Sequence, residues 1–143
     1  MNTKYYYNLY FSEGLLNDKA KIKRQIKVSE DIKTNQIEEQ FYIVTLAQNK
    51  ENNLEFLKIT NLRQKAYNVS EIFVVGFAKD YNEAKELVVK IVNEVLVKTN
   101  GLDVRRYLLE TQRKSLRPKK STKKSKENRL SKVKRWISGM FFK

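Results

Sequence analysis

The sequence predicts a small α/β domain in which a mainly parallel, three-stranded sheet is covered by helices, followed by a basic C-terminal tail and a terminal amphipathic helix. Two observations predict the domain: short runs of β-favouring residues alternate with stretches of helical apolar spacing, and a body of about 110 residues can bury a core. A third observation, the concentration of lysine near the C-terminus, predicts the tail. An α+β arrangement with a hairpin is the alternative.

The first half of the chain contains two predicted strands. Residues 5–11 alternate in β-favouring types, which predicts a strand that ends at Ser12. From Leu15 to about Val28, apolar residues share a rough helical face among basic ones, which predicts a basic helix, although the same residues also fit alternation. The apolar run from Phe41 to Leu46 has the composition of a buried strand.

Residues 53–67 fit either a helix or a strand, whereas residues 72–78 fit only a strand. One or two short helices are expected between Asn53 and Tyr67, but residues 54–60 also fit a hairpin strand. The continuous run from Ile72 to Ala78 predicts a central strand that is covered on both faces.

Two helices follow this strand. The first is expected to begin at a capping-box-like pair, Asp80 and Glu83, and to end at Asn100 and Gly101. The second is expected from Asp103 to Arg117, because Pro118 disfavours the helical conformation of the residue before it. The predicted organisation is thus a domain over residues 1–114, a disordered basic linker over 115–129 and a basic amphipathic helix over 130–143.

Charge is strongly segregated along the chain. Residues 1–110 contain 17 Lys and Arg against 15 Asp and Glu, whereas residues 111–143 contain 13 against a single acid, Glu127. Such asymmetry indicates a polyanionic partner. The cationic residues assigned to this contact are Arg113, Lys114, Arg117, Lys119, Lys120, Lys123, Lys124, Lys126, Arg129, Lys132, Lys134 and Arg135.

Three interpretations of the tail stay open. The first is nucleic acid bound through phosphates without sequence specificity. The second is an anionic membrane surface, contacted by an amphipathic helix whose apolar arc would hold Leu130, Val133, Trp136, Ile137, Met140 and Phe141. In the third, the same arc packs on the domain core or on a dimer mate, and the protein is an interaction module.

Composition excludes several kinds of chemistry. The chain contains no Cys and no His, so disulfides, thiolate chemistry and the commonest general base are absent, and neither a metal nor a cofactor is expected. Its longest apolar run has seven residues, too short to span a bilayer, and its N-terminus lacks a signal-peptide pattern, which suggests a cytoplasmic protein, with the inner membrane surface as a second location. No Ser lies in a recognisable nucleophile elbow, so catalysis is not expected.

Three smaller features each have two interpretations. Tyr6 and Tyr10 share one strand face and could stack bases, but core packing is favoured. Asp80 and Glu83 are better explained as helix caps than as metal ligands or acid–base groups. The adjacent Arg105 and Arg106 could clamp a phosphate, but neighbouring helical residues diverge by about 100°, which favours a solvated face.

The segments Tyr42–Leu46, Leu62–Tyr67 and Val74–Ala84 resemble small proteins of anaerobic Firmicutes-type bacteria to which no activity is attached. The resemblance covers roughly residues 4–110, and its motifs are structural. It implies a bacterial, cytoplasmic setting and does not extend to the basic tail.

Overall fold

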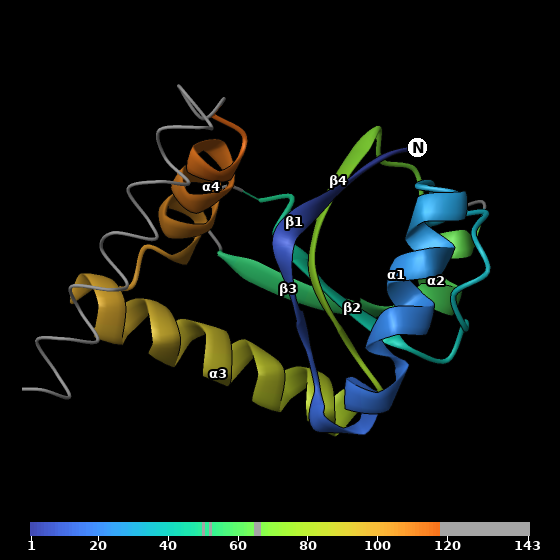
Figure 1. Ribbon diagram of the computed structural model, residues 1–143, viewed down its shortest axis with the longest axis horizontal. Coiled ribbons are helices and arrows are strands. Elements are labelled where there is room, and N and C mark those ends of the chain that lie inside the picture. The colour runs from blue at the N-terminus through green and yellow to red at the C-terminus, as the bar shows by residue number, and fades with distance from the viewer. Residues whose placement is uncertain (50, 52, 65–66, 118–143) are drawn as a thin grey trace, which may run out of the picture. The chain divides into compact units, whose positions relative to one another are not determined.

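The computed structural model describes residues 1–49, 51, 53–64 and 67–117 (Figure 1). The elements are, in order, β1 (Asn2–Phe11), the 3-10 helix η1 (Glu13–Asp18), α1 (Lys19–Val28), β2 (Tyr42–Leu46), β3 (Leu54–Lys58), α2 (Ile59–Arg63), β4 (Glu71–Ala78), α3 (Tyr81–Thr99) and α4 (Val104–Ser115). The chain divides after Gln112 into two units, and the sheet belongs to the first.

The sheet has four strands in the order β1-β4-β2-β3. β1 is parallel to β4, while β2 is antiparallel to both β4 and β3. The α/β class is therefore confirmed, but the expectation of three mainly parallel strands is wrong, because the described residues form a mixed four-stranded sheet with one parallel pair. The physical reason is that only seven residues separate β2 from β3, fewer than the crossover of a parallel pair needs.

β3 lies where a helix was favoured and a hairpin strand over residues 54–60 was the alternative, and the alternative is correct. Its residues pair with β2 from Tyr42 opposite Lys58 to Leu46 opposite Leu54. Leu54 and Phe56 pack on one face of the sheet and Leu57 packs on the other, so the helical spacing expected from Leu54 onward does not apply here. A short helix, α2, follows and buries Ile59 and Leu62, in the second half of the range where one was expected.

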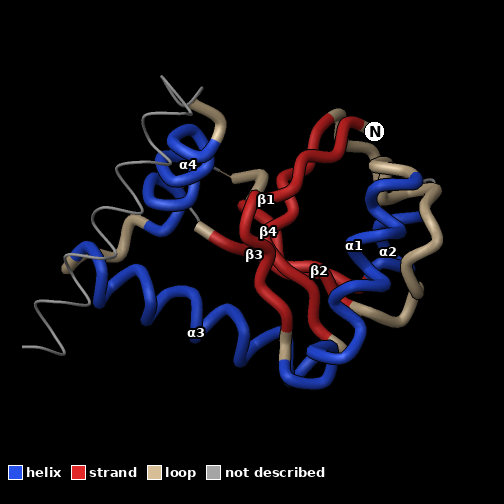
Figure 2. Tube along the Cα trace, in the orientation of Figure 1, coloured by secondary structure: helices blue, strands red, loops and turns tan. Residues whose placement is uncertain are grey.

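Helices cover both faces of the sheet, as Figure 2 shows. One hydrophobic cluster joins Val44 and Val75 of the sheet to the buried side chains of α3 and α4. A second cluster joins Val74 and Phe77 to η1, α1 and α2. β4 lies between β1 and β2 and contributes to both clusters, so it is the inner strand that its apolar run predicts, with a parallel neighbour on one side only.

The ends of α3 differ in detail from the expected caps. Asp80 caps the helix, since its Oδ1 accepts a hydrogen bond from the Glu83 N–H at 2.9 Å. The Glu83 carboxylate, however, accepts from the Gly14 N–H at 2.7 Å and so ties α3 to η1. At the other end, Asn100 rather than Gly101 adopts the left-handed conformation, with φ of 57°.

A bulge lies in the middle of β4. Val44 and Thr45 of β2 are consecutive, but they pair with Gly76 and Val74, which leaves Val75 as the extra residue. At this point β1 approaches closely, because a Cβ placed on Gly76 would lie 2.6 Å from the Tyr10 carbonyl oxygen. Glycine is therefore required here by the neighbouring backbone.

We expect Gly76→Ala to lower the free energy of unfolding by about 1–3 kcal/mol, because the added methyl group must displace the backbone of β1. Urea unfolding followed by circular dichroism measures the change. Gly101→Ala is the matched control, since its Cβ would meet nothing closer than 3.8 Å. Equal stability of the two variants would show that β1 does not approach β4 as described.

Candidate functional site

The described part of the basic segment lies at the C-terminal end of α4. Arg113, Lys114 and Arg117 are all exposed, and the first two fall in the last helical turn, where cations are stabilised by the helix dipole. None of the three makes an ion pair with an acid among residues 1–117 that the structure describes.

Most of the predicted contact residues lie outside the described residues. These are the cationic residues Lys119, Lys120, Lys123, Lys124, Lys126, Arg129, Lys132, Lys134 and Arg135, and the apolar residues Leu130, Val133, Trp136, Ile137, Met140 and Phe141. Their assignment rests on the sequence.

The residues just before Arg113 are fixed to the edge of the sheet. The Gln112 side chain accepts a hydrogen bond from the Tyr7 N–H at 2.7 Å and donates one to the Tyr5 carbonyl at 3.1 Å. Thr111 Oγ1 hydrogen bonds to the Tyr6 hydroxyl. Gln112 thus satisfies backbone groups at the edge of β1, and the basic segment begins immediately after this anchored position.

Tyr6 and Tyr10 belong to the core, as the sequence favours. Tyr6 is 4% exposed, and its ring stacks on that of Tyr10 with centroids 6.0 Å apart and an interplanar angle of 4°. Tyr10 packs against the same cluster and hydrogen bonds to Glu94. The faces of these rings are occupied by each other and by the core, so they do not form a platform for bases.

Burial changes the titration of these groups. Desolvation raises the pKa of Tyr6 to about 12, although the hydrogen bond to Thr111 acts in the opposite direction. Desolvation, followed by the neighbouring Glu94 carboxylate, raises the pKa of Tyr10 as well. The partial burial of Glu94 acts to raise its pKa, but hydrogen bonds from Tyr10 and Lys98 outweigh this effect and hold the pKa below its ordinary value.

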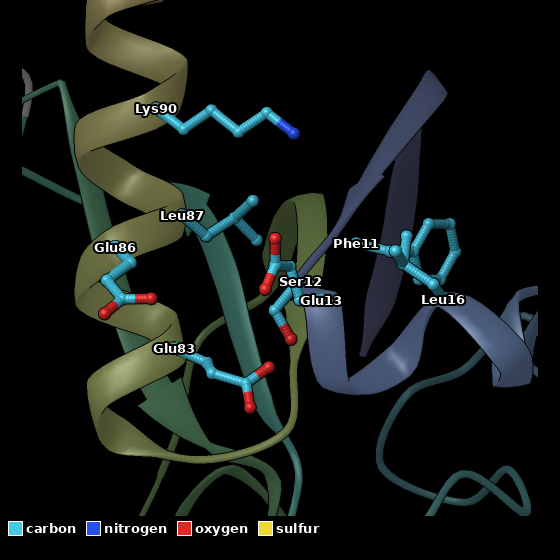
Figure 3. A pocket seen from close by; sticks show the side chains of 8 residues that line it. All are labelled: Phe11, Ser12, Glu13, Leu16, Glu83, Glu86, Leu87 and Lys90. Atoms are coloured by element: carbon cyan, nitrogen blue, oxygen red, sulfur yellow. The ribbon is translucent and has the colours of Figure 1, made fainter.

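A pocket of about 340 Å³ lies between the start of η1 and the first half of α3 (Figure 3). Its lining residues are Phe11, Ser12, Glu13, Leu16, Glu83, Glu86, Leu87 and Lys90. With three carboxylates against one ammonium group, the pocket disfavours anionic ligands.

Two polar groups of this pocket have structural partners. Glu83 accepts from the Gly14 N–H at 2.7 Å, and Ser12 Oγ accepts from the Lys79 N–H at 3.1 Å. Over the described residues, no three acidic side chains gather to hold a metal ion. These contacts favour Asp80 as a helix cap rather than a metal ligand or acid–base group. Glu83 connects α3 to η1.

Arg105 and Arg106 diverge, as their adjacency on a helix requires. Arg105 donates to the carbonyl groups of Ala47 and Asn49, beyond the end of β2, so it is a structural tie rather than part of a solvated face. Arg106 is exposed and pairs with Glu110 at 3.1 Å. The two guanidinium groups therefore do not form a phosphate clamp.

One aromatic surface was missed from the sequence. Tyr81 at the start of α3 contacts Phe56 of β3 and Tyr42 of β2, with ring centroids 5.4 and 6.1 Å away, and it is 53% exposed. The Lys85 ammonium group lies 5.6 Å from the centroid of the Tyr81 ring. The alternation of Leu54, Phe56 and Lys58 was the signal that could have placed Phe56 on this face.

Comparison of the chain with protein-family models, with curated proteins and with solved structures found no match. Among the described residues, no helix combines the length and the apolar composition needed to cross a bilayer.

Stability should fall at alkaline pH. In the unfolded chain Tyr6 loses its proton near its ordinary pKa of 10.0, whereas in the folded chain it does so near 12. Between these two pKa values the unfolded state therefore binds fewer protons than the folded state. The contribution of Tyr6 to stability is complete below pH 10 and is lost as the pH rises towards 12. Thermal unfolding as a function of pH measures the loss.

Tyr6→Phe should make this alkaline loss of stability less steep, because the titrating hydroxyl group is removed. At neutral pH the variant should have a free energy of unfolding about 1 kcal/mol lower than the parent chain, because the hydrogen bond to Thr111 is lost. Tyr81→Phe, at a half-exposed position, is the control and should follow the parent chain. If Tyr6→Phe and the parent chain lose stability identically at alkaline pH, Tyr6 does not contribute to the loss.

Proposed function

We propose that this chain is a non-enzymatic protein that binds nucleic acid without sequence specificity through its Lys-rich C-terminal segment, residues 113–135. The observation that carries the proposal is charge segregation: residues 111–143 hold 13 basic residues against Glu127 alone, while the preceding 110 residues are nearly balanced. A segment of this composition neutralises phosphates and releases their counterions on binding.

The residue types support contact without sequence readout. The chain contains 22 Lys and 8 Arg, and lysine is a point charge that lacks the planar fork with which arginine recognises a guanine edge or a carboxylate. Phosphate contacts of this kind position a protein on nucleic acid but carry no sequence information.

The described residues supply a further argument. Arg113, Lys114 and Arg117 are exposed and lack acidic partners in the described part of the chain. In the first unit, by contrast, several cations are paired, as in Lys4 with Glu71 and Lys98 with Glu94. A run of cations without acidic partners creates an electrostatic field that attracts a polyanion.

Binding to a DNA duplex of arbitrary sequence should weaken steeply with salt. For about six neutralised phosphates, the slope of the logarithm of affinity against the logarithm of salt concentration is about −5. Fluorescence anisotropy between about 50 and 200 mM salt measures this slope. A slope near zero would contradict the proposal.

Neutralising Lys119, Lys120, Lys123 and Lys124 to Gln should reduce the magnitude of that slope by about 3–4, at about 0.9 per lost contact. The matched control neutralises four lysines of the body, Lys58, Lys79, Lys85 and Lys90, and should leave most of the slope intact. Equal losses in the two variants would show that net charge, rather than the segment, determines binding.

Anionic vesicles distinguish the membrane interpretation. If the segment acts on nucleic acid, Trp136→Ala with Phe141→Ala should leave DNA affinity nearly unchanged, because these side chains make no phosphate contact. Strong vesicle binding that this double variant abolishes, together with weak DNA binding, would favour the membrane surface instead.

A further inference from the structure

Within the first unit, positive charge concentrates on α1. Five of its ten residues are basic and none is acidic. The basic residues are Lys19, Lys21, Lys23, Arg24 and Lys27, all of them exposed. The opposite side of the helix buries Ile22 and partly buries Ile26 in the cluster that covers the sheet.

Three of these lysines form a ridge along the helix. Lys19, Lys23 and Lys27 are spaced four residues apart, so their Cα atoms rise by about 6 Å per step on one side of the helix. The ammonium groups of Lys19 and Lys23 lie 5.7 and 6.0 Å from the centroid of the same ring, that of the buried Phe11. Two of the three charges are thus positioned by the core itself.

Helix stability does not account for this arrangement. Like charges four residues apart are destabilising, and Lys19 and Lys21 lie in the first turn, where the helix dipole disfavours cations. In the described part of the chain, Lys21 alone among these residues makes an ion pair, with the exposed Glu38 at 3.8 Å.

The nearby acids have other partners or lie at the helix ends. Asp31 pairs with the N-terminal ammonium group at 3.7 Å, and it also accepts from the Lys33 N–H. Asp18 precedes α1 without capping it through its side chain, and Glu30 follows the helix. The three lysines of the ridge are exposed, and none of them makes an ion pair within the described part of the chain.

We infer that the outward face of α1 is a second contact for the phosphate backbone of nucleic acid, separate from the C-terminal segment. The choice of ligand rests on the proposed function. A membrane surface fits this face poorly, because the apolar side of α1 packs into the core and so cannot enter the acyl layer. The outward face instead presents point charges of the kind that neutralise phosphates.

The test is the triple variant Lys19→Gln, Lys23→Gln and Lys27→Gln in the full chain, bound to a DNA duplex of arbitrary sequence over a range of salt. The magnitude of the salt slope should fall by about 2–3, and the affinity at about 0.1 M salt should fall at least about tenfold. The control variant neutralises Lys79, Lys85 and Lys90, which removes the same charge from another surface, and should change the slope by less than about 1.

A loss in the control equal to that in the α1 variant would overturn the inference. The α1 variant should melt at or above the temperature of the parent chain, because neutralisation removes like-charge repulsion. If it nevertheless fails to fold, the single variants Lys23→Gln and Lys27→Gln serve the same purpose, each lowering the slope by about 0.9. The triple replacement of these lysines by Arg should keep the slope, and a loss there would also count against the inference.

Combining the α1 variant with the tail variant separates the two proposals. If α1 neutralisation lowers the slope and tail neutralisation does not, the proposed function fails while the α1 contact stands. If only tail neutralisation acts, the α1 contact is overturned and the proposed function stands. Loss of binding to phosphatidylglycerol vesicles but not to DNA in the α1 variant would also overturn the inference.

Discussion

The fold depends on the packing of β4 between two neighbouring strands and two hydrophobic clusters. Val74 and Phe77 face the cluster with η1, α1 and α2, whereas Val75 faces the cluster with α3 and α4. Every covering helix therefore packs on a face of the sheet to which β4 contributes side chains. Gly76 allows β1 to approach the bulge in this strand. Tyr10 and Phe11, which are consecutive in β1, face opposite clusters because side chains alternate along a strand.

The two faces carry different electrostatic character. On α3, two of the three lysines contact an acid or an aromatic ring of the same helix, Lys98 with Glu94 and Lys85 with Tyr81. On the side of α1, the cations share a helix that contains no acid. Charge is therefore unevenly distributed over a body whose formal charge is nearly balanced, because five of its 17 basic residues lie on α1, a helix without an acid.

The sequence was sufficient for elements whose local and tertiary preferences agree. The uninterrupted run in β4 and the Asp80 cap of α3 have one physical solution each, and both were predictable. β3 was not, because Leu54 and Leu57 fit a helical spacing as well as two faces of a strand, and pairing with β2 decided between them. The bridge from Glu83 to Gly14 was equally hidden, since a capping box predicts a local partner and the structure provides one 69 residues away.

The candidate contact surfaces could likewise be predicted from the sequence only in part. Charge segregation is a property of composition and is visible in the sequence, whereas the positions of individual charges depend on which face of a helix is buried. The basic character of α1 could be predicted from its residues, but the role of Phe11 in holding Lys19 and Lys23 could not, because it depends on how the end of β1 packs beneath the helix. Once Ile22 and Ile26 pack into the cluster with η1 and α2, the opposite side of α1 must face water, and half of the helix is basic. The same hydrophobic contact that stabilises this layer therefore also forms its cationic surface.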